Sequence, residues 1–75
     1  MRLISDVAAD IRRDWKNVYF GAKPYLAAMA SLSDKNSRYL AEDATSIVLY
    51  FLSNASTYRG ENARKYKAEL KEIIK

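Results

Sequence analysis

The sequence contains no cysteine and no histidine, and these two absences exclude several classes of protein. Without cysteine there are no disulfide bonds, and without either residue there is no zinc finger and no Cys- or His-based nucleophile. No apolar run reaches the 18 residues that would predict a transmembrane helix. The first 15 residues carry charges throughout, unlike the apolar core of a signal peptide. We therefore expect a cytoplasmic protein without a cofactor or a metal.

The short chain limits how much surface folding can bury. Its 75 residues are enough for one domain, residues 1–75, that buries roughly 60% of the surface of the unfolded chain. Small proteins often offset this thin margin with disulfides or a metal, and neither is expected here. Good helix packing, large side chains or self-association must supply the stability, and the 49% hydrophobic and 12% aromatic content suits all three.

The N-terminal segment has the apolar period of an amphipathic helix. The residues on this stripe are Ile4, Val7, Ala8, Ile11, Trp15 and Val18. Asp6, Asp10 and Asp14 follow one edge of the stripe, and Ser5 or Asp6 is a candidate N-cap. We expect Arg2 and Arg13 to neutralise two of the three carboxylates. A metal site is not expected, because carboxylates one turn apart on a helix diverge rather than converge on one ion.

The stretch 15-WKNVYFGAKPYLAAM-29 predicts a corner between two helices. Gly21 suits a helix C-terminus, and Pro24 suits the first turn of the next helix. We expect residues 19–23 to form the corner, with Lys23 outside helical geometry, and a second helix over residues 24–32. The aromatic side chains are expected to fill the corner, with a surface role left open for Phe20 and Lys23. Tyrosines on apolar stripes are expected in the core, and Tyr39 and Tyr58 on the surface.

The polar segment 33–43 predicts a connector rich in turns, with Asp43 as the N-cap of a third helix over residues 43–54. This segment contains 47-IVLYFL-52, whose six apolar residues fit a buried strand or a buried helix. We prefer a helix, because a single strand would have no evident partner. A small protein cannot easily bury a helix that is apolar all round. The candidate protein-interface residues are therefore Leu49, Tyr50 and Leu52, together with Tyr58, which is expected on the surface because its surroundings are polar.

The last segment, residues 58–75, predicts an amphipathic helix with Thr57 as a candidate N-cap, or with a start after Gly60. One side of this helix carries a basic row consisting of Arg64, Lys67, Lys71 and Lys75. We expect the three lysines to lack acidic neighbours one turn away. Such a row could follow a phosphate backbone, or it could be a solvated face near the helix C-terminus. No sequence signature of a nucleic-acid-binding fold accompanies it.

Together these elements predict an all-α fold, a compact bundle of three to four short helices. No motif arranges an acid–base pair or an activated nucleophile, so we do not expect an enzyme. The runs 15-WKNVYFGAKPYLAAM-29 and 47-IVLYFLSNASTYRGENARKYKAELK-71 resemble small uncharacterised helical proteins of bacterial phages, prophages and mobile elements. The resemblance covers more than half the chain and implies an accessory protein of a bacterial cell that binds a macromolecule. It implies no site residues.

Two functions are compatible with these observations. The first is a non-enzymatic protein-interaction module that self-associates or binds a host or phage protein. It follows from the apolar third helix and the thin core. The alternative is a nucleic-acid-binding accessory protein, which follows from the net charge of +4 and the basic row. A membrane-surface helix is disfavoured, because the acidic residues of the last helix would oppose anionic lipid.

Overall fold

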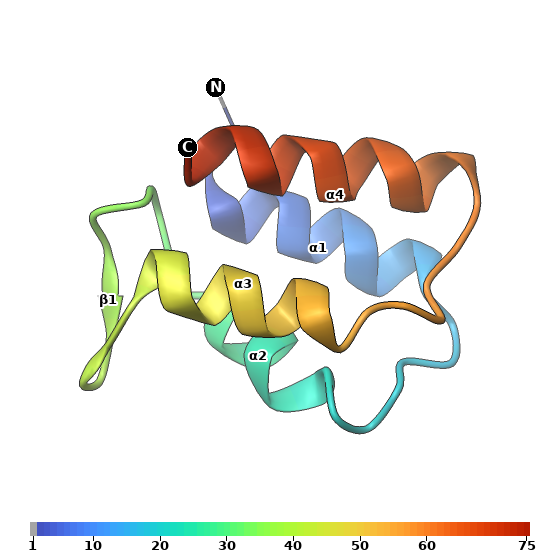
Figure 1. The fold of residues 1–75 in the computed structure, drawn as a ribbon, viewed down its shortest axis with the longest axis horizontal. Coiled ribbons are helices and arrows are strands. Elements are labelled where there is room, and N and C mark those ends of the chain that lie inside the picture. The colour runs from blue at the N-terminus through green and yellow to red at the C-terminus, as the bar shows by residue number, and fades with distance from the viewer. Residues whose placement is uncertain (1) are drawn as a thin grey trace.

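The computed structural model describes residues 2–75, which form four helices and one small hairpin (Figure 1). The elements, in chain order, are α1 (Ile4–Asp14), α2 (Lys23–Met29), β1 (Arg38–Tyr39), β2 (Glu42–Asp43), α3 (Ala44–Ser53) and α4 (Glu61–Ile73). Helix α1 packs against α4 and α2, and α2 packs against α3. The predicted helical bundle is thus confirmed in its main features. The chain is not entirely α-helical, however, because it contains a two-stranded sheet.

Helix α1 forms because the helical part of its apolar stripe is buried completely. Ile4, Val7, Ala8 and Ile11 are all inaccessible to solvent, but the helix ends at Asp14. Trp15 and Val18, the last residues of the predicted stripe, therefore lie beyond it, and Val18 is only partly buried. The helix begins before both predicted caps, and the Asp6 carboxylate accepts a hydrogen bond from the Leu3 N–H at 3.3 Å. The first helical N–H groups donate to backbone carbonyls of residues 32 and 33 at 3.0 and 2.8 Å. The start of α1 is therefore fixed by the segment that follows α2.

The second helix is shorter than predicted and begins one residue earlier. Lys23 is its first residue, contrary to the expectation that the residue before Pro24 would be extended. Turn hydrogen bonds from Ala22 N–H to Tyr19 O and from Lys23 N–H to Phe20 O lead the chain into the helix. At the other end, residues 30–32 make hydrogen bonds three residues back, as in a 3₁₀ turn. Residues 30–32, which were predicted as part of this helix, thus form a 3₁₀-like turn after it.

The connector 33–43 contains both the predicted turns and a hairpin that was not predicted. The Ser37 hydroxyl accepts hydrogen bonds from two N–H groups, and the Asp34 carboxylate accepts one. Strands β1 and β2 then pair antiparallel, with Tyr39 opposite Glu42. Two residues, Leu40 and Ala41, connect them. Strands of two residues are too short for the alternation that marks a strand in a sequence.

The N-terminal ends of α3 and α4 follow from local chemistry. The Asp43 carboxylate accepts a hydrogen bond from the Ser46 N–H at 2.8 Å, which confirms Asp43 as the N-cap of α3. Helix α4 begins at Glu61, directly after Gly60, whose φ is +116°. Thr57 is wrong as an N-cap, and the predicted start after Gly60 is confirmed. A φ of this size favours glycine, so Gly60 determines where the helix starts.

The core contains one face of the helical segment 47–52 together with an aromatic cluster. Ile47, Val48 and Phe51 are buried, which confirms the choice of a helix. The Trp15 ring stacks on Tyr58 at 4.8 Å and meets the edge of Phe51 at 6.2 Å. The corner itself is not filled as expected, because Tyr19 and Phe20 are 43% and 75% exposed. Trp15 instead joins α1 to α3 and to the segment before α4.

Candidate interaction surfaces

The molecule divides into two halves of different charge. Residues 17–58, which include α2, the hairpin and α3, carry three basic side chains (Lys23, Lys35, Arg38) and three acidic ones (Asp34, Glu42, Asp43). This α2–α3 half therefore has no net charge. The α1–α4 half, residues 2–16 and 59–75, carries ten basic and six acidic side chains, the whole net charge of +4. Figure 1 shows α1 and α4 together in the upper part, and α2 and α3 below them.

Exposed apolar side chains gather in the neutral half. The large apolar residues that are exposed there are Tyr19, Phe20, Tyr39, Leu40, Leu49 and Tyr50. In the α1–α4 half, Leu3 is the comparable residue within the described chain. Single exposed apolar residues are normal on protein surfaces, whereas a contiguous group of them marks a contact site. Tyr39 and Leu40 line one pocket, whereas Tyr19 and Phe20 pair with each other in the segment before α2. The α2–α3 half is thus the better candidate for a protein interface.

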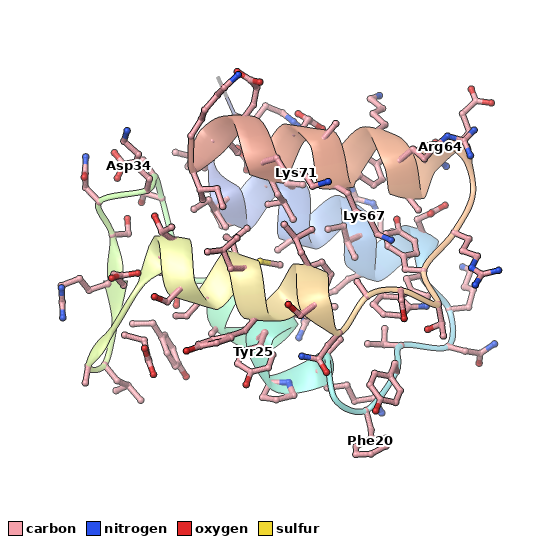
Figure 2. The ribbon with its side chains drawn as sticks, viewed as in Figure 1. Phe20, Tyr25, Asp34, Arg64, Lys67 and Lys71 are labelled. Atoms are coloured by element: carbon pink, nitrogen blue, oxygen red, sulfur yellow. The ribbon has the colours of Figure 1, made fainter. Side chains whose placement is uncertain are left out.

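A small apolar pocket lies between the hairpin, α2 and α3, and we call it the hairpin pocket. Its volume is about 190 Å³. Its apolar lining consists of Pro24, Tyr25 and Ala28 from α2, Tyr39 and Leu40 from the hairpin, and Ile47 from α3. Glu42 is the charged residue of the lining. The Tyr25 ring, labelled in Figure 2, packs on the Tyr50 ring of α3 with 5.5 Å between the ring centroids. This contact extends the apolar surface from the pocket to α3.

Leu40 is the most exposed large apolar residue of the described chain. It is 87% exposed at the tip of the hairpin and contributes to the rim of the hairpin pocket. Its φ is +58°, in the left-handed region that costs a non-glycine residue roughly 1–2 kcal/mol. Backbone strain of this kind concentrates at functional positions. Leu40 thus has a strained backbone and an apolar side chain that is almost fully exposed in the monomer. It is therefore a candidate contact residue.

The predicted interface residues differ in how exposed they are in the structure. Leu49 and Tyr50 are 51% and 48% exposed, whereas Leu52 is partly buried against the core. Tyr58 is wrong as a surface residue, because it is 3% exposed. Its hydroxyl donates a hydrogen bond to Asp14 Oδ2 at 2.8 Å. Burial and the neighbouring Asp14 carboxylate raise the pKa of Tyr58 above its usual value.

The basic row of α4 is less uniform than the sequence predicts. Figure 2 shows Lys67 and Lys71 on the side of α4 next to α3, with Arg64 towards the start of the helix. Arg64 and Lys71 are exposed, and neither makes an ion pair with any residue that the structure describes. The expectation that Lys75 lacks an acidic neighbour is wrong, because its Nζ lies 3.5 Å from Glu72 Oε2. Glu72 precedes it by three residues, within reach along one helix face.

The expectation that Lys67 is unpaired is also wrong, because Lys67 donates hydrogen bonds to the loop before α4. Its Nζ donates hydrogen bonds of 2.7 Å to the backbone carbonyls of Ala55 and Tyr58. Burial, followed by the charges of Lys71 and Arg59, lowers the pKa of Lys67, while the two carbonyl acceptors favour the ammonium form. Lys67 therefore stabilises residues 54–60, and two of its three N–H groups are used there.

Arg59 is a basic residue that the sequence did not place beside the row. Its charge acts on Lys67, although it belongs to the segment before α4. It makes no ion pair with another described residue, and its Nε donates to Ser56 O at 3.3 Å. The helical period of α4 could not reveal it, because the loop path decides where Arg59 lies.

The acidic row of α1 is divided among different partners. Asp10 accepts hydrogen bonds from both Arg2 and Arg13, so the two arginines neutralise one carboxylate of this row rather than two, and Arg2 also pairs with Glu69 of α4. The hydrogen bond from Arg2 lowers the pKa of Asp10. Asp14 instead accepts hydrogen bonds from Asn62 and Tyr58, in that order the main causes of its lowered pKa. Across residues 2–75, no cluster of three or more acidic groups could hold a metal ion.

Two further findings bear on function. Among the helices of the described chain, none has both the length and the apolar character needed to cross a membrane. No protein-family model, no curated protein and no solved structure matches this chain. The case for a function therefore comes from the neutral apolar half and the basic half of the molecule itself.

Proposed function

We propose that this protein is a small non-enzymatic protein-interaction module that binds through the α2–α3 half. The observation that supports this proposal is Leu40, an exposed leucine in a strained conformation beside the hairpin pocket. Burying a leucine side chain contributes about 1.5–3 kcal/mol, which exceeds the backbone cost of holding it at positive φ. Covering Leu40 therefore contributes more than the strained conformation costs.

The resemblance to small proteins of phages, prophages and mobile elements suggests the setting. An accessory protein of this kind acts in the cytoplasm of a bacterial cell and binds a host protein, a phage protein or a second copy of itself. The neutral α2–α3 half supports a protein partner better than a nucleic acid, because it has no excess of basic groups to meet phosphates.

Affinity capture by a tagged copy, from a bacterial lysate that also contains untagged copies of this chain, tests this proposal with and without nuclease. Leu40→Asn is the informative variant, because it removes the apolar side chain and is compatible with positive φ. Lys71→Gln is the matched control in the α1–α4 half. We expect a protein to be retained by the parent and by Lys71→Gln, with nuclease present, and not to be retained by Leu40→Asn. Equal retention by all three proteins would contradict the proposal.

A second candidate function is nucleic-acid binding by the α1–α4 half. The observation that favours it is that Arg59, Arg64 and Lys71 lack ion-pair partners among residues 2–75. Phosphate contacts make binding depend steeply on salt. Replacing Arg64 or Lys71 with glutamine should then lower the salt slope by about one for each phosphate that is no longer neutralised. Leu40→Asn should leave the slope unchanged, and retention that does not depend on salt would argue against this candidate.

A further inference from the structure

We infer that the occupant of the hairpin pocket is Leu40 from a second copy of this chain, in a two-fold symmetric dimer. This inference rests on the proposed function and names the partner. Leu40 and the pocket lie on the same surface, so each copy offers both a protruding side chain and a place to receive one. In a two-fold interface each residue meets its counterpart reciprocally, so the two insertions occur together.

The size of the pocket fits a leucine side chain. Its volume is about 190 Å³, and a dry apolar cavity of roughly 150 Å³ is large enough for a benzene molecule. Leu40 of the same chain does not fill this space, because it stands at the rim with 87% of its surface exposed. A leucine that enters from outside would contact Tyr25, Ala28 and Ile47.

The distribution of charge favours a second copy on this half. Two molecules that each carry a net charge of +4 repel one another, and all of that net charge lies in the α1–α4 half. The α2–α3 half is neutral and has charges of both signs near the pocket, with Glu42 in its lining and Lys23 directly before Pro24. Approach through this half minimises the repulsion. We therefore expect dimerisation to depend little on salt.

The area required is available but modest. A standard interface takes roughly 800 Å² from each partner, about one sixth of the total surface of 4739 Å². The pocket and one leucine are smaller than this, so the contact must continue over Tyr39 and Tyr50, which are 39% and 48% exposed. We expect a reversible dimer with a dissociation constant of the order of micromolar, at the low end of interface sizes.

Analytical ultracentrifugation from about 1 μM to about 1 mM tests the inference. The parent should pass from monomer to dimer in this range. Leu40→Asn should weaken the dimer by at least about 100-fold, because each dimer then has two fewer buried leucines. Leu3→Asn is the matched control, since Leu3 is 46% exposed in the α1–α4 half and does not line the pocket. It should change the dissociation constant by no more than about twofold.

Mixing two defective variants tests the reciprocal insertion directly. Ala28→Leu fills the pocket and leaves Leu40 intact, whereas Leu40→Asn leaves the pocket intact. Neither homodimer retains an insertion, but the mixed dimer retains one of the two. We expect the mixed dimer to be about tenfold tighter than either variant homodimer. Circular dichroism checks that Ala28→Leu folds, and if it does not, the Leu40 and Leu3 variants alone decide.

The possible results separate this inference from the proposed function. A parent that dimerises, a weakened Leu40→Asn and an unchanged Leu3→Asn would support the inference. A monomeric parent at every concentration would overturn it, as would a dimer that Leu40→Asn does not weaken. The proposed function would survive either result if capture of a protein still required Leu40, and it would fall as well if capture did not.

Discussion

Replacing Leu40 should make the monomer more stable, although it removes a large apolar residue. The side chain is 87% exposed, so its deletion removes almost no buried surface from the monomer. The backbone at this position has a φ of +58°, which glycine adopts freely and asparagine tolerates better than leucine does. Leu40→Gly and Leu40→Asn therefore remove strain at little cost.

The expected gain in stability combines two contributions. Left-handed geometry costs leucine roughly 1–2 kcal/mol, and glycine returns roughly 0.5–1 kcal/mol of this through the greater freedom of its unfolded chain. The net gain is about 0.5–1 kcal/mol for Leu40→Gly, and Leu40→Asn should change stability in the same direction. A protein of 75 residues has a total stability of roughly 4–11 kcal/mol. Because about 1 kcal/mol raises Tm by roughly 4–8 °C in a domain of this size, the change is measurable.

Thermal unfolding followed by circular dichroism measures this gain. The protein must be diluted below the dimer dissociation constant, because association would raise the Tm of the parent alone. Ala41→Gly is the matched control in the same two-residue turn. Ala41 is outside the positive-φ region, so glycine there should lower stability by about 0.5–1 kcal/mol. A dilute parent that melts at or above both Leu40 variants would refute the strain at Leu40.

Three further predictions concern the interactions that hold α4 and its loop. Tyr58→Phe should cost about 0.5–1.5 kcal/mol because it removes the hydrogen bond, and Tyr58→Ala about 3–5 kcal/mol because it removes the aromatic packing, as measured by urea unfolding. Equal costs would mean that the ring is not buried. Lys67→Met should cost about 1–3 kcal/mol and speed hydrogen exchange in residues 54–60; unchanged exchange would contradict its role there. Because hydrogen bonds lower the pKa of Asp14 below its usual 3.8, its stabilising contribution is complete above pH 3.8 and disappears as the pH falls through its folded-state pKa. Asp14→Asn should thus show a smaller drop in Tm on acidification than the parent, and an identical drop would rule out this contribution.

The sequence predicted those elements whose causes are local. The stripe of α1 could be recognised because buried residues recur with the helical period, and all of Ile4, Val7 and Ile11 are buried. The N-cap at Asp43 and the start of α4 after Gly60 depend on groups within a few residues of each other. The hairpin gave no such signal, because two-residue strands joined by Leu40 and Ala41 lack both alternation and a typical turn sequence.

Composition and helical period also determined that this protein has more apolar surface than its core can hold, and that its charge is positive. Only the tertiary structure decided which side chains remain available. Tyr58 is buried by Asp14 and Trp15, more than 40 residues away in the chain, and Lys67 is held by carbonyls of a preceding loop. Such contacts have no local pattern, because they depend on how helices pack and not on the spacing of residues along them. The same packing brings α1 and α4 together, which concentrates the charge in one half and leaves Leu40 on the neutral other half.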